Sequence, residues 1–339
     1  MNCWAMASDE VAVVDNLSGT IMLVVHADAK DPNALADAES RLDELEDKLA
    51  QPKPDLPPMN MDSDGLAEDA FVSSFGKDNY KRAVDKVKQY TLSGDVMQVV
   101  PSQRFSAPFE EAPINLYRAL RRLNPSPYMY FLDLEDFYIV GSSPEVLARL
   151  EDEQVTVRPI VGTRRRGETA VDDQLLEKEM LAEPKEIAEH LMLIDLGRND
   201  VGRISQPGSV EVTEKMVVER YSHVMHITSN VVGQVNAGMS AIDVVKATLQ
   251  AGTLSGAPKI RAMEIIDELE KTKRKVYAGG IGYFSANGEF DTCIALRTAV
   301  AKNKKFYVQA GAGIVADSNP IKEYEETVNK AKALMNALR

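Results

Sequence analysis

The sequence contains few of the features that mark several large classes of protein. Only two of its 339 residues are cysteine, so we expect no disulfide framework and a cytoplasmic location. No uninterrupted apolar run is long enough to span a membrane, and the N-terminus lacks the basic and apolar regions of a signal peptide. A net charge of −13 argues against nucleic acid and anionic membranes as partners. The four histidines and two cysteines show no zinc-ligand spacing.

The chain does contain enough apolar sequence for a sizeable core, since 44% of its residues are hydrophobic. Apolar runs that flank turn signals, as around Asn287-Gly288, predict β-hairpins. Such hairpins outnumber the strand–helix–strand pattern that is typical of parallel sheets. The sequence therefore predicts an α+β fold with large antiparallel sheets that helices cover. Cys293 is expected to be a small core residue.

The pattern along the chain divides it into three parts. Residues 1–50 predict a hairpin over 11–27 and an amphipathic helix over 34–50, and the proline-rich residues 51–68 predict a linker. Residues 69–339 are expected to form one further domain. Within it we expect strands over 96–106 and 155–163, a long helix over 172–196 that Pro184 could interrupt, and a last helix that starts near Asn319.

Two pairs of glutamates are candidates for a metal site. Glu186 and Glu189 lie three residues apart on a predicted helix, as do Glu323 and Glu326. For either pair alone, a solvated helix face is the more common arrangement. The first pair, however, stands in an otherwise apolar helix, and the second follows a run of small residues that a ligand could approach closely. If the pairs face each other, their oxygens suit Mg²⁺ better than Ca²⁺.

Other motifs are weaker when they are taken alone. The segment 252–259 is rich in glycine but lacks the spacing of a phosphate loop, so it does not indicate nucleotide binding. Its amides could still meet a carboxylate at the start of the next helix. Gly279–Gly282 is more typical of strand packing, and Gly311–Gly313 fits either packing or ligand binding. A histidine such as His226, in an alternating strand pattern, is more often a satisfied core residue than a catalyst.

Taken in order, these segments resemble the chorismate-utilising enzymes, and within that family the large subunits of anthranilate synthases. Ten segments carry the resemblance in collinear order: MQVVPSQRF (97–105), NPSPYMYF (124–131), GSSPE (141–145), PIVGTRRRG (159–167), EIAEHLMLIDLGRNDVGRIS (186–205), VMHITSNVVG (224–233), GTLSGAPKIRAMEIIDELE (252–270), GGIGYFS (279–285), DTCIALRTA (291–299) and QAGAGIVADSNPIKEYEET (309–327). The resemblance implies the fold of that family, in which the antiparallel sheets form a sandwich. It also implies a reaction in which chorismate and ammonia give anthranilate and pyruvate, the first step of tryptophan biosynthesis.

The resemblance also implies roles for individual residues. Glu189 and Glu326 would bind Mg²⁺ directly, and Glu186 and Glu323 would bind it through water. The metal would grip the ring carboxylate of the substrate. Thr253 would lie near the leaving hydroxyl, and His226 would be the acid–base group. The substrate contacts would be Gly162, Thr163, Tyr277, Arg297, Gly311, Ala312 and Gly313.

Two positions distinguish between members of the family. Gln98 stands where isochorismate synthases resemble one another in having a lysine that activates water, and glutamine cannot act as that base. Val161 stands where aminodeoxychorismate synthases typically have a nucleophilic lysine. An apolar residue there favours anthranilate synthesis, with aminodeoxychorismate synthesis as the closest alternative.

Two further expectations concern partners and regulation. Neither cysteine has the context of a glutaminase nucleophile, so ammonia must come from solution or from a glutamine amidotransferase subunit. Gly197–Asp200 could be structural or could belong to that subunit interface. Pro127, Tyr128 and Met129 match half of the family's tryptophan feedback site, but most of the N-terminal region that completes it in the family has no counterpart here. A non-catalytic fragment is therefore the alternative of a different class.

Overall fold

The computed structural model describes residues 3–52, 56–58, 70–221 and 224–337. The chain divides into two compact units, residues 1–58 and 59–339. The first unit contains a hairpin of β1 (Glu10–Asp15) and β2 (Thr20–Val25), followed by α1 (Ala34–Ala50). The Asp15 carboxylate accepts hydrogen bonds from the Leu17 and Ser18 amides and so closes the hairpin turn. The predicted hairpin and helix are confirmed, whereas most of the predicted linker 51–68 lies outside the described residues.

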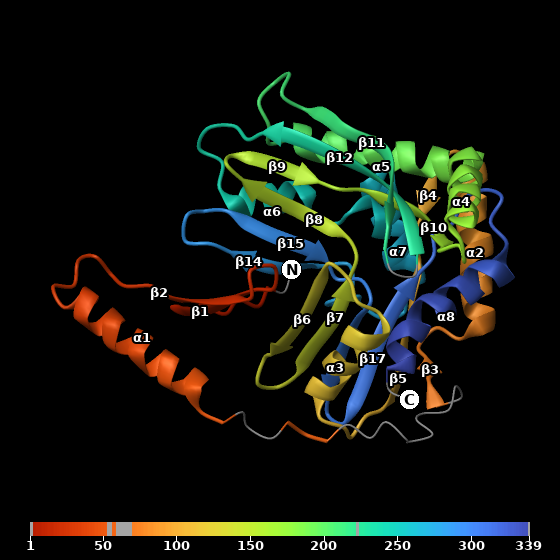
Figure 1. Ribbon diagram of the computed structural model, residues 1–339. Coiled ribbons are helices and arrows are strands. Elements are labelled where there is room, and N and C mark those ends of the chain that lie inside the picture. The colour runs from red at the N-terminus through yellow and green to blue at the C-terminus, as the bar shows by residue number, and fades with distance from the viewer. Residues whose placement is uncertain (1–2, 53–55, 59–69, 222–223, 338–339) are drawn as a thin grey trace. The chain divides into compact units, whose positions relative to one another are not determined.

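The second unit is built on two large sheets, and every strand pair in the described residues is antiparallel (Figure 1). The seven-stranded sheet has the order β10-β12-β9-β8-β15-β14, with β11 paired to β12. Its strands are β8 (Val146–Glu151), β9 (Gln154–Val157), β10 (Ile160–Arg165), β11 (Glu211–Arg220), β12 (Val224–Gln234), β14 (Gly280–Phe284) and β15 (Phe290–Ile294).

The six-stranded sheet has the order β3-β5-β17-β16-β7-β6. Its strands are β3 (Val72–Ser73), β5 (Ser102–Pro108), β6 (Tyr128–Asp133), β7 (Tyr138–Ser143), β16 (Thr298–Lys302) and β17 (Lys305–Gly311). A short ladder of β4 (Gln98–Val99) and β13 (Gly256–Ala257) completes the unit.

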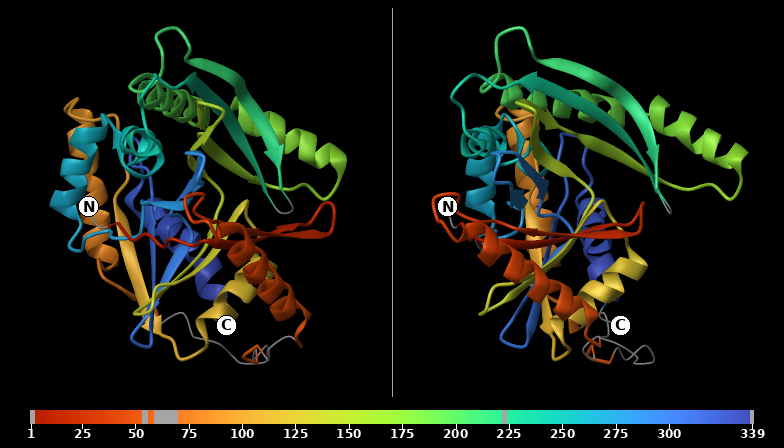
Figure 2. Two further views of the ribbon diagram at one scale, coloured as in Figure 1. Left: turned by 90° about the vertical axis from the view of Figure 1, so that its left-hand side faces the viewer. Right: turned by 60° about the vertical axis from the view of Figure 1, so that its left-hand side comes forward.

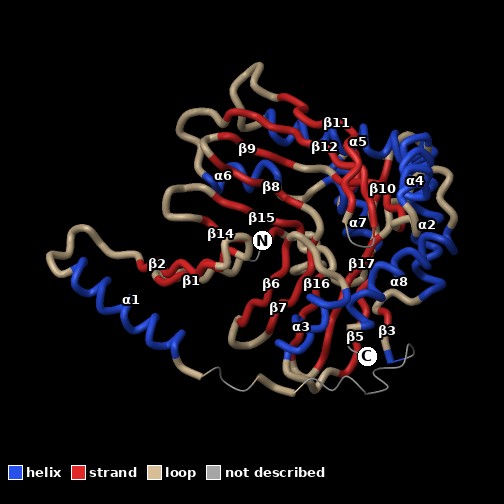
Figure 3. Tube along the Cα trace, viewed as in Figure 1, coloured by secondary structure: helices blue, strands red, loops and turns tan. Residues whose placement is uncertain are grey.

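Helices cover both sheets (Figure 3). They are α2 (Lys77–Leu92), α3 (Pro113–Leu123), α4 (Ala170–Ala182), α5 (Pro184–Gly202), α6 (Ala241–Thr248), α7 (Lys259–Leu269) and α8 (Pro320–Asn336). Helices α5 and α6 pack on the seven-stranded sheet, while α3 and α8 pack on the six-stranded sheet. Figure 2 shows β11 and β12 as a long curved hairpin, and α5 packs against β12. The predicted α+β fold with large antiparallel sheets is confirmed.

Prolines divide three of the predicted elements, and the interruption at Pro184 was expected. The strand predicted over 96–106 is two strands, because Pro101 separates β4 from β5. The strand predicted over 155–163 is likewise broken, since Pro159 separates β9 from β10. The helix predicted over 172–196 is two helices, and Pro184 is the first residue of the second. In each case proline cannot supply the backbone N–H that a continuous element requires.

One arrangement in this fold positions the residues of interest. Beyond the end of β17, the Ile314 amide donates to the Val99 carbonyl at 2.8 Å, and the Ala312 amide donates to Pro101 at 3.3 Å. Residues 311–314 therefore lie beside residues 98–101, between the six-stranded sheet and α8. As predicted, Cys293 is buried. No helix in the described part of the chain is both long and apolar enough to cross a membrane.

Candidate active site

The first glutamate pair lies in the opening turns of α5. Glu186 Oε1 accepts from Arg164 Nη1 at 2.6 Å, whereas its Oε2 is buried and has no hydrogen-bond partner. A Cβ atom on Gly162 would lie only 2.5 Å from that oxygen, so any other residue there would force the Glu186 carboxylate to move. Glycine also suits the backbone of this position, whose φ is +67°.

Glu189, one turn further along α5, faces the strand end described above. Its Oε1 accepts from Gln98 Nε2 at 3.0 Å. A Cβ atom on Gly313 would lie 2.1 Å from Gln98 Nε2 and 3.6 Å from Glu189 Oε1. Gly313 is therefore required for close packing against both residues, and the structure brings Gln98, Glu189 and Gly313 together.

The second glutamate pair lies in the first turns of α8, which Asn319 caps. Glu323 is buried, and this burial raises the pKa of its carboxyl group. Glu326 is more exposed and forms an ion pair with Lys330 Nζ at 2.7 Å. Because the same ammonium donates to the Gly311 carbonyl at 3.2 Å, this pair also lies near the end of β17.

One residue of each pair is linked to the same short segment. Glu189 lies at Gly313, and Lys330, the partner of Glu326, lies at Gly311. Within the described residues, however, no three His, Cys, Asp or Glu side chains are grouped closely enough to hold a metal ion. The described residues therefore show no closed set of metal ligands, and the magnesium site stays a prediction.

His226 is fixed by a bulge in the neighbouring strand. The register between β10 and β12 shifts at Gly162 and Thr163, which lie between two paired stretches. In this bulge the Gly162 carbonyl lies 2.9 Å from His226 Nδ1, and Thr163 Oγ1 lies 3.1 Å from it. Because a carbonyl can only accept, Nδ1 carries the hydrogen and Nε2 keeps its lone pair. Burial lowers the pKa of His226, so the ring is a neutral base.

A buried carboxyl group that the motif analysis did not single out faces Thr253. Glu145 directly precedes β8, and its Oε1 accepts from Thr253 Oγ1 at 2.7 Å. Burial raises the pKa of Glu145 to about 7, against opposing effects of Thr253, Lys330 and Arg297. The only sequence signal was an acidic residue after proline within an otherwise apolar run.

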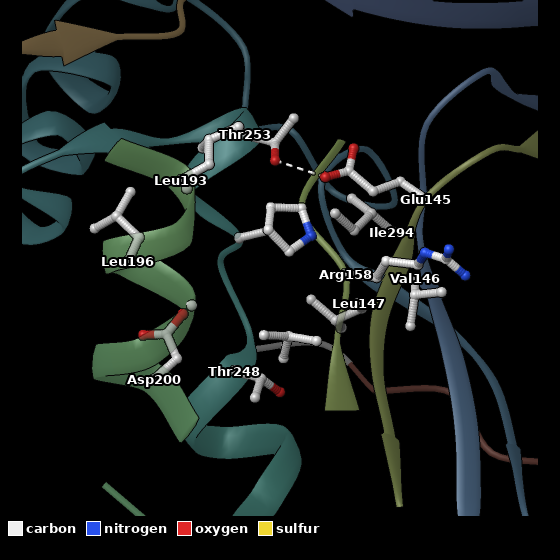
Figure 4. Close-up of a pocket in the computed structure, with 15 residues that line it drawn as sticks. Glu145, Val146, Leu147, Arg158, Leu193, Leu196, Asp200, Thr248, Thr253 and Ile294 are labelled. Carbon is white, nitrogen blue, oxygen red and sulfur yellow. Dashed lines mark hydrogen bonds between the residues drawn. The ribbon is translucent and has the colours of Figure 1, made fainter. Parts of the chain in front are cut away.

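Glu145 and Thr253 lie at one end of a pocket between α5 and the seven-stranded sheet (Figure 4). Leu193, Leu196 and Asp200 of α5 line its other side. Lys259 is the first residue of α7. Its Nζ donates to both carboxylate oxygens of Asp200, at 2.8 Å to Oδ1 and 2.6 Å to Oδ2. Gly197–Asp200 was expected to be structural or to belong to a subunit interface. For Asp200, the structure shows a structural role.

Of the two predicted carboxylate-binding residues, Tyr277 is buried and Arg297 is partly buried. Burial raises the pKa of Tyr277, whose hydroxyl would lie 3.1 Å from a Cβ atom on Gly311. Arg297 adopts a positive φ of +45°. Its positive charge favours ionisation of Glu145 and lowers the pKa of His226.

The remaining predicted residues lie further out. Val161 packs with Met180, Met225 and Ile227 as an apolar side chain. Tyr128 donates to Asp291 Oδ1 at 2.8 Å and so joins β6 to β15, while Met129 packs on the core of the six-stranded sheet. The structure shows these packing contacts for two of the three predicted tryptophan-site residues, and tryptophan binding stays a prediction.

Comparison with known proteins gives one consistent result. Residues 2–336 match the family model described as chorismate binding enzyme. The chain is 58% identical over 333 residues to anthranilate synthase component 1 of Pseudomonas aeruginosa, covering 98% of this chain and 68% of that protein. It is 54% identical over 332 residues to the protein of the same name from Neisseria meningitidis serogroup A, with coverage of 98% and 67%. It therefore spans about two thirds of the length of these relatives.

Solved structures agree with these sequence matches. The crystal structure of anthranilate synthase component I from Streptococcus pneumoniae superposes with a TM-score of 0.86 at 43% identity, covering 96% of this chain and 72% of that one. The menaquinone-specific isochorismate synthase of Escherichia coli shares the fold, with a TM-score of 0.79 at 22% identity and coverage of 95% and 73%.

Proposed function

Because the chain belongs to the chorismate-binding enzyme family, we propose that it is the large subunit of an anthranilate synthase. In the proposed reaction, chorismate and ammonia give anthranilate, pyruvate and water. The observation that carries the proposal is the family match over residues 2–336. Two buried polar groups support it: Glu145, which accepts a hydrogen bond from Thr253, and His226, which donates one from Nδ1 to the Gly162 carbonyl. An acid for the leaving hydroxyl, a base for the ring proton and a cation for a carboxylate are the groups that this reaction requires.

The departure of the ring hydroxyl is assigned to Glu145. With a pKa of about 7, this carboxyl group is partly protonated at neutral pH and can donate a proton to the hydroxyl as it leaves as water. Thr253 holds the carboxyl group in place through the 2.7 Å hydrogen bond. Ammonia forms the new C–N bond on the ring, and the proton that the resulting ammonium loses returns to the Glu145 carboxylate.

The loss of pyruvate is assigned to His226 and Arg297. His226 Nε2 accepts the ring proton, and the electrons of that C–H bond make the ring aromatic as the C–O bond to the enolpyruvyl group breaks. The enolpyruvyl group leaves as the enolate of pyruvate, and the proton held by His226 returns to its carbon to give pyruvate. The Gly162 carbonyl, 2.9 Å from Nδ1, stabilises the imidazolium that forms. Arg297 and Tyr277 bind the enolpyruvyl carboxylate, for which the planar guanidinium is suited.

Magnesium is part of the proposal. The site suits such an ion because its donors are hard carboxylate oxygens, one of which, Glu186 Oε2, is buried without a partner. Glu189 and Glu326 would hold the ion directly, and Glu186 and Glu323 through water. When bound, Mg²⁺ supplies positive charge to orient the ring carboxylate of the substrate. The enzyme would accordingly be a Mg²⁺-dependent lyase.

The source of ammonia is proposed to be a glutamine amidotransferase subunit. Cys293 is buried and its pKa is raised by that burial, so it is not a glutaminase nucleophile. Cys3 is exposed in the hairpin unit. Free ammonium salts should support the reaction in the absence of that subunit.

The test is incubation of the purified chain with chorismate, an ammonium salt and Mg²⁺. We expect fluorescent anthranilate, together with an equal amount of pyruvate, and no product when Mg²⁺ is chelated. Accumulation of aminodeoxychorismate would overturn the proposal in favour of the alternative amination. A folded chain that binds chorismate without turnover would overturn it in favour of a non-catalytic fragment.

A further inference from the structure

A buried ion pair follows α7 and lies against the proposed active site. Glu270, the C-cap residue of α7, pairs with Arg274 four residues later. Arg274 Nη2 lies 2.6 Å from Glu270 Oε1, and Nε lies 3.0 Å from Oε2. Their side chains are only 16% and 5% exposed, so protein groups must satisfy their remaining polar atoms.

The other donors of Arg274 reach the backbone of two site segments. Nη1 donates to the Leu254 carbonyl at 2.6 Å, directly after Thr253. Nη2 donates to the Val100 carbonyl at 2.6 Å, two residues after Gln98. One guanidinium therefore joins the 252–254 turn to the segment that carries Gln98.

The Glu270–Arg274 pair also contacts a third segment, the start of β5. Glu270 Oε1 accepts from the amide and the hydroxyl of Ser102, at 2.8 and 2.7 Å, where β5 begins beside Gly311. The Arg274 guanidinium also lies 5.5 Å from the centre of the Tyr277 ring. Arg274 thus binds the backbone next to Thr253 and lies over the ring of Tyr277, the two residues predicted to contact the substrate.

We propose that Arg274 is a positioning residue for this reaction, because its guanidinium fixes the turn of Thr253 and the ring of Tyr277 relative to each other. The inference rests on the proposed function. Lysine cannot replace it, since an ammonium is a point charge that cannot span Glu270 and two carbonyls with a planar fork. Misplacement by about 1 Å costs roughly 100-fold in rate in other enzymes.

The experiment compares R274K with R261K in the complete chain. Arg261 lies in the first turn of α7, and its Nε and Nη2 both donate to Asp95 Oδ2, at 3.0 and 2.8 Å. Its Nη1 donates to Glu264, so these hydrogen bonds do not go to the site segments. We expect kcat/KM for chorismate to fall roughly 10- to 100-fold in R274K and to stay near the wild-type value in R261K. Equal kcat/KM in R274K and wild type would overturn the proposal.

Coupling distinguishes positioning from a general loss of structure. If Arg274 acts through Thr253 and Tyr277, R274K must cost much less activity in a T253V or Y277F background than in the wild type. Full additivity in both backgrounds would overturn the proposal. E270Q provides a second test if R274K does not fold, because the amide keeps the Ser102 contacts but loses the charge that orients Arg274. An unchanged kcat/KM in E270Q would also contradict the proposal.

A binding measurement separates this inference from the proposed function. Chorismate should raise the melting temperature of the wild type and of R261K, and should raise that of R274K clearly less. If the wild type binds chorismate but makes no anthranilate, the proposed function fails, and the melting shifts still decide the role of Arg274.

Discussion

Glu145 shows how the fold changes the chemistry of a single side chain. Burial disfavours its charged form and raises its pKa from an ordinary 4.5 to about 7. Because the folded state holds this proton more tightly than the unfolded state, the resulting stabilisation is complete below pH 4.5. It is then lost as the pH rises through about 7. The same property makes the group available as an acid at neutral pH.

We predict that E145Q lowers kcat by roughly 100-fold or more, because an amide has no proton to give to the leaving hydroxyl. The Thr253 hydroxyl can still donate to the amide oxygen, so the fold should persist. The wild-type rate should also fall as the pH rises above about 7, and E145Q should lack this dependence. Initial rates of anthranilate fluorescence on both sides of pH 7 measure both effects.

The matched control is E151Q. Glu151 ends β8, near the start of which Glu145 lies, but its side chain is 65% exposed and pairs with Arg149. E151Q should keep the wild-type rate and pH profile. A wild-type rate in E145Q would remove Glu145 from the mechanism.

At this scale, the sequence identified residue types and left their protonation states open. Its resemblance to a family pointed to His226 and Thr253, and the structure places both in polar contacts. The hydrogen on His226 Nδ1 depends on the Gly162 carbonyl in a strand bulge, which periodicity does not reveal. The pKa of Glu145 depends on burial by residues distant in the chain, so the motif alone did not single it out.

At the scale of elements, local sequence signals predicted most helices and hairpins. They did not predict the strand breaks at Pro101 and Pro159 or which distant elements pack together. The α1 helix and the β1–β2 hairpin follow the predicted ranges closely, because periodicity and turn residues are local. The pairing of β11 with β12 along seven register positions was not predicted, since β11 is mostly exposed and lacks a clear apolar alternation. How α5 and α7 meet could not be predicted either, because it depends on one distant ion pair.

That ion pair supplies a prediction about stability. Lys259 and Asp200 have side chains only 11% and 7% exposed, so K259M leaves a buried carboxylate without its cation. We expect K259M to lower the free energy of unfolding by about 3 kcal/mol or more. The double variant D200N/K259M should recover part of this loss, because no unpaired charge remains. Urea unfolding measures both variants, and a loss below about 1 kcal/mol in K259M would contradict the assigned role.

At the scale of the whole molecule, the proposed site joins parts of the chain that are far apart in sequence. Glu186 and Glu189 begin α5, and Glu323 and Glu326 begin α8. Helix periodicity shows that each pair shares a face, but it cannot show that the faces approach each other. In the structure Glu189 lies close to Gly313, and Lys330, the ion-pair partner of Glu326, donates to the Gly311 carbonyl. Lys185 of α5 also lies 4.0 Å from Asp317, just before α8. A cation shared by the pairs would therefore link α5 to α8.

This linkage can be measured without an activity assay. An ion that binds only the folded chain stabilises it by about 2.7 kcal/mol at 100 times its dissociation constant. We expect Mg²⁺ to raise the melting temperature of the wild type, and E326Q to abolish both this rise and the Mg²⁺-dependent activity while the chain stays folded. E325Q is the matched control, because Glu325 is exposed on the same turn of α8 and should leave the rise unchanged. An identical Mg²⁺-induced rise in E326Q and E325Q would exclude Glu326 as a ligand.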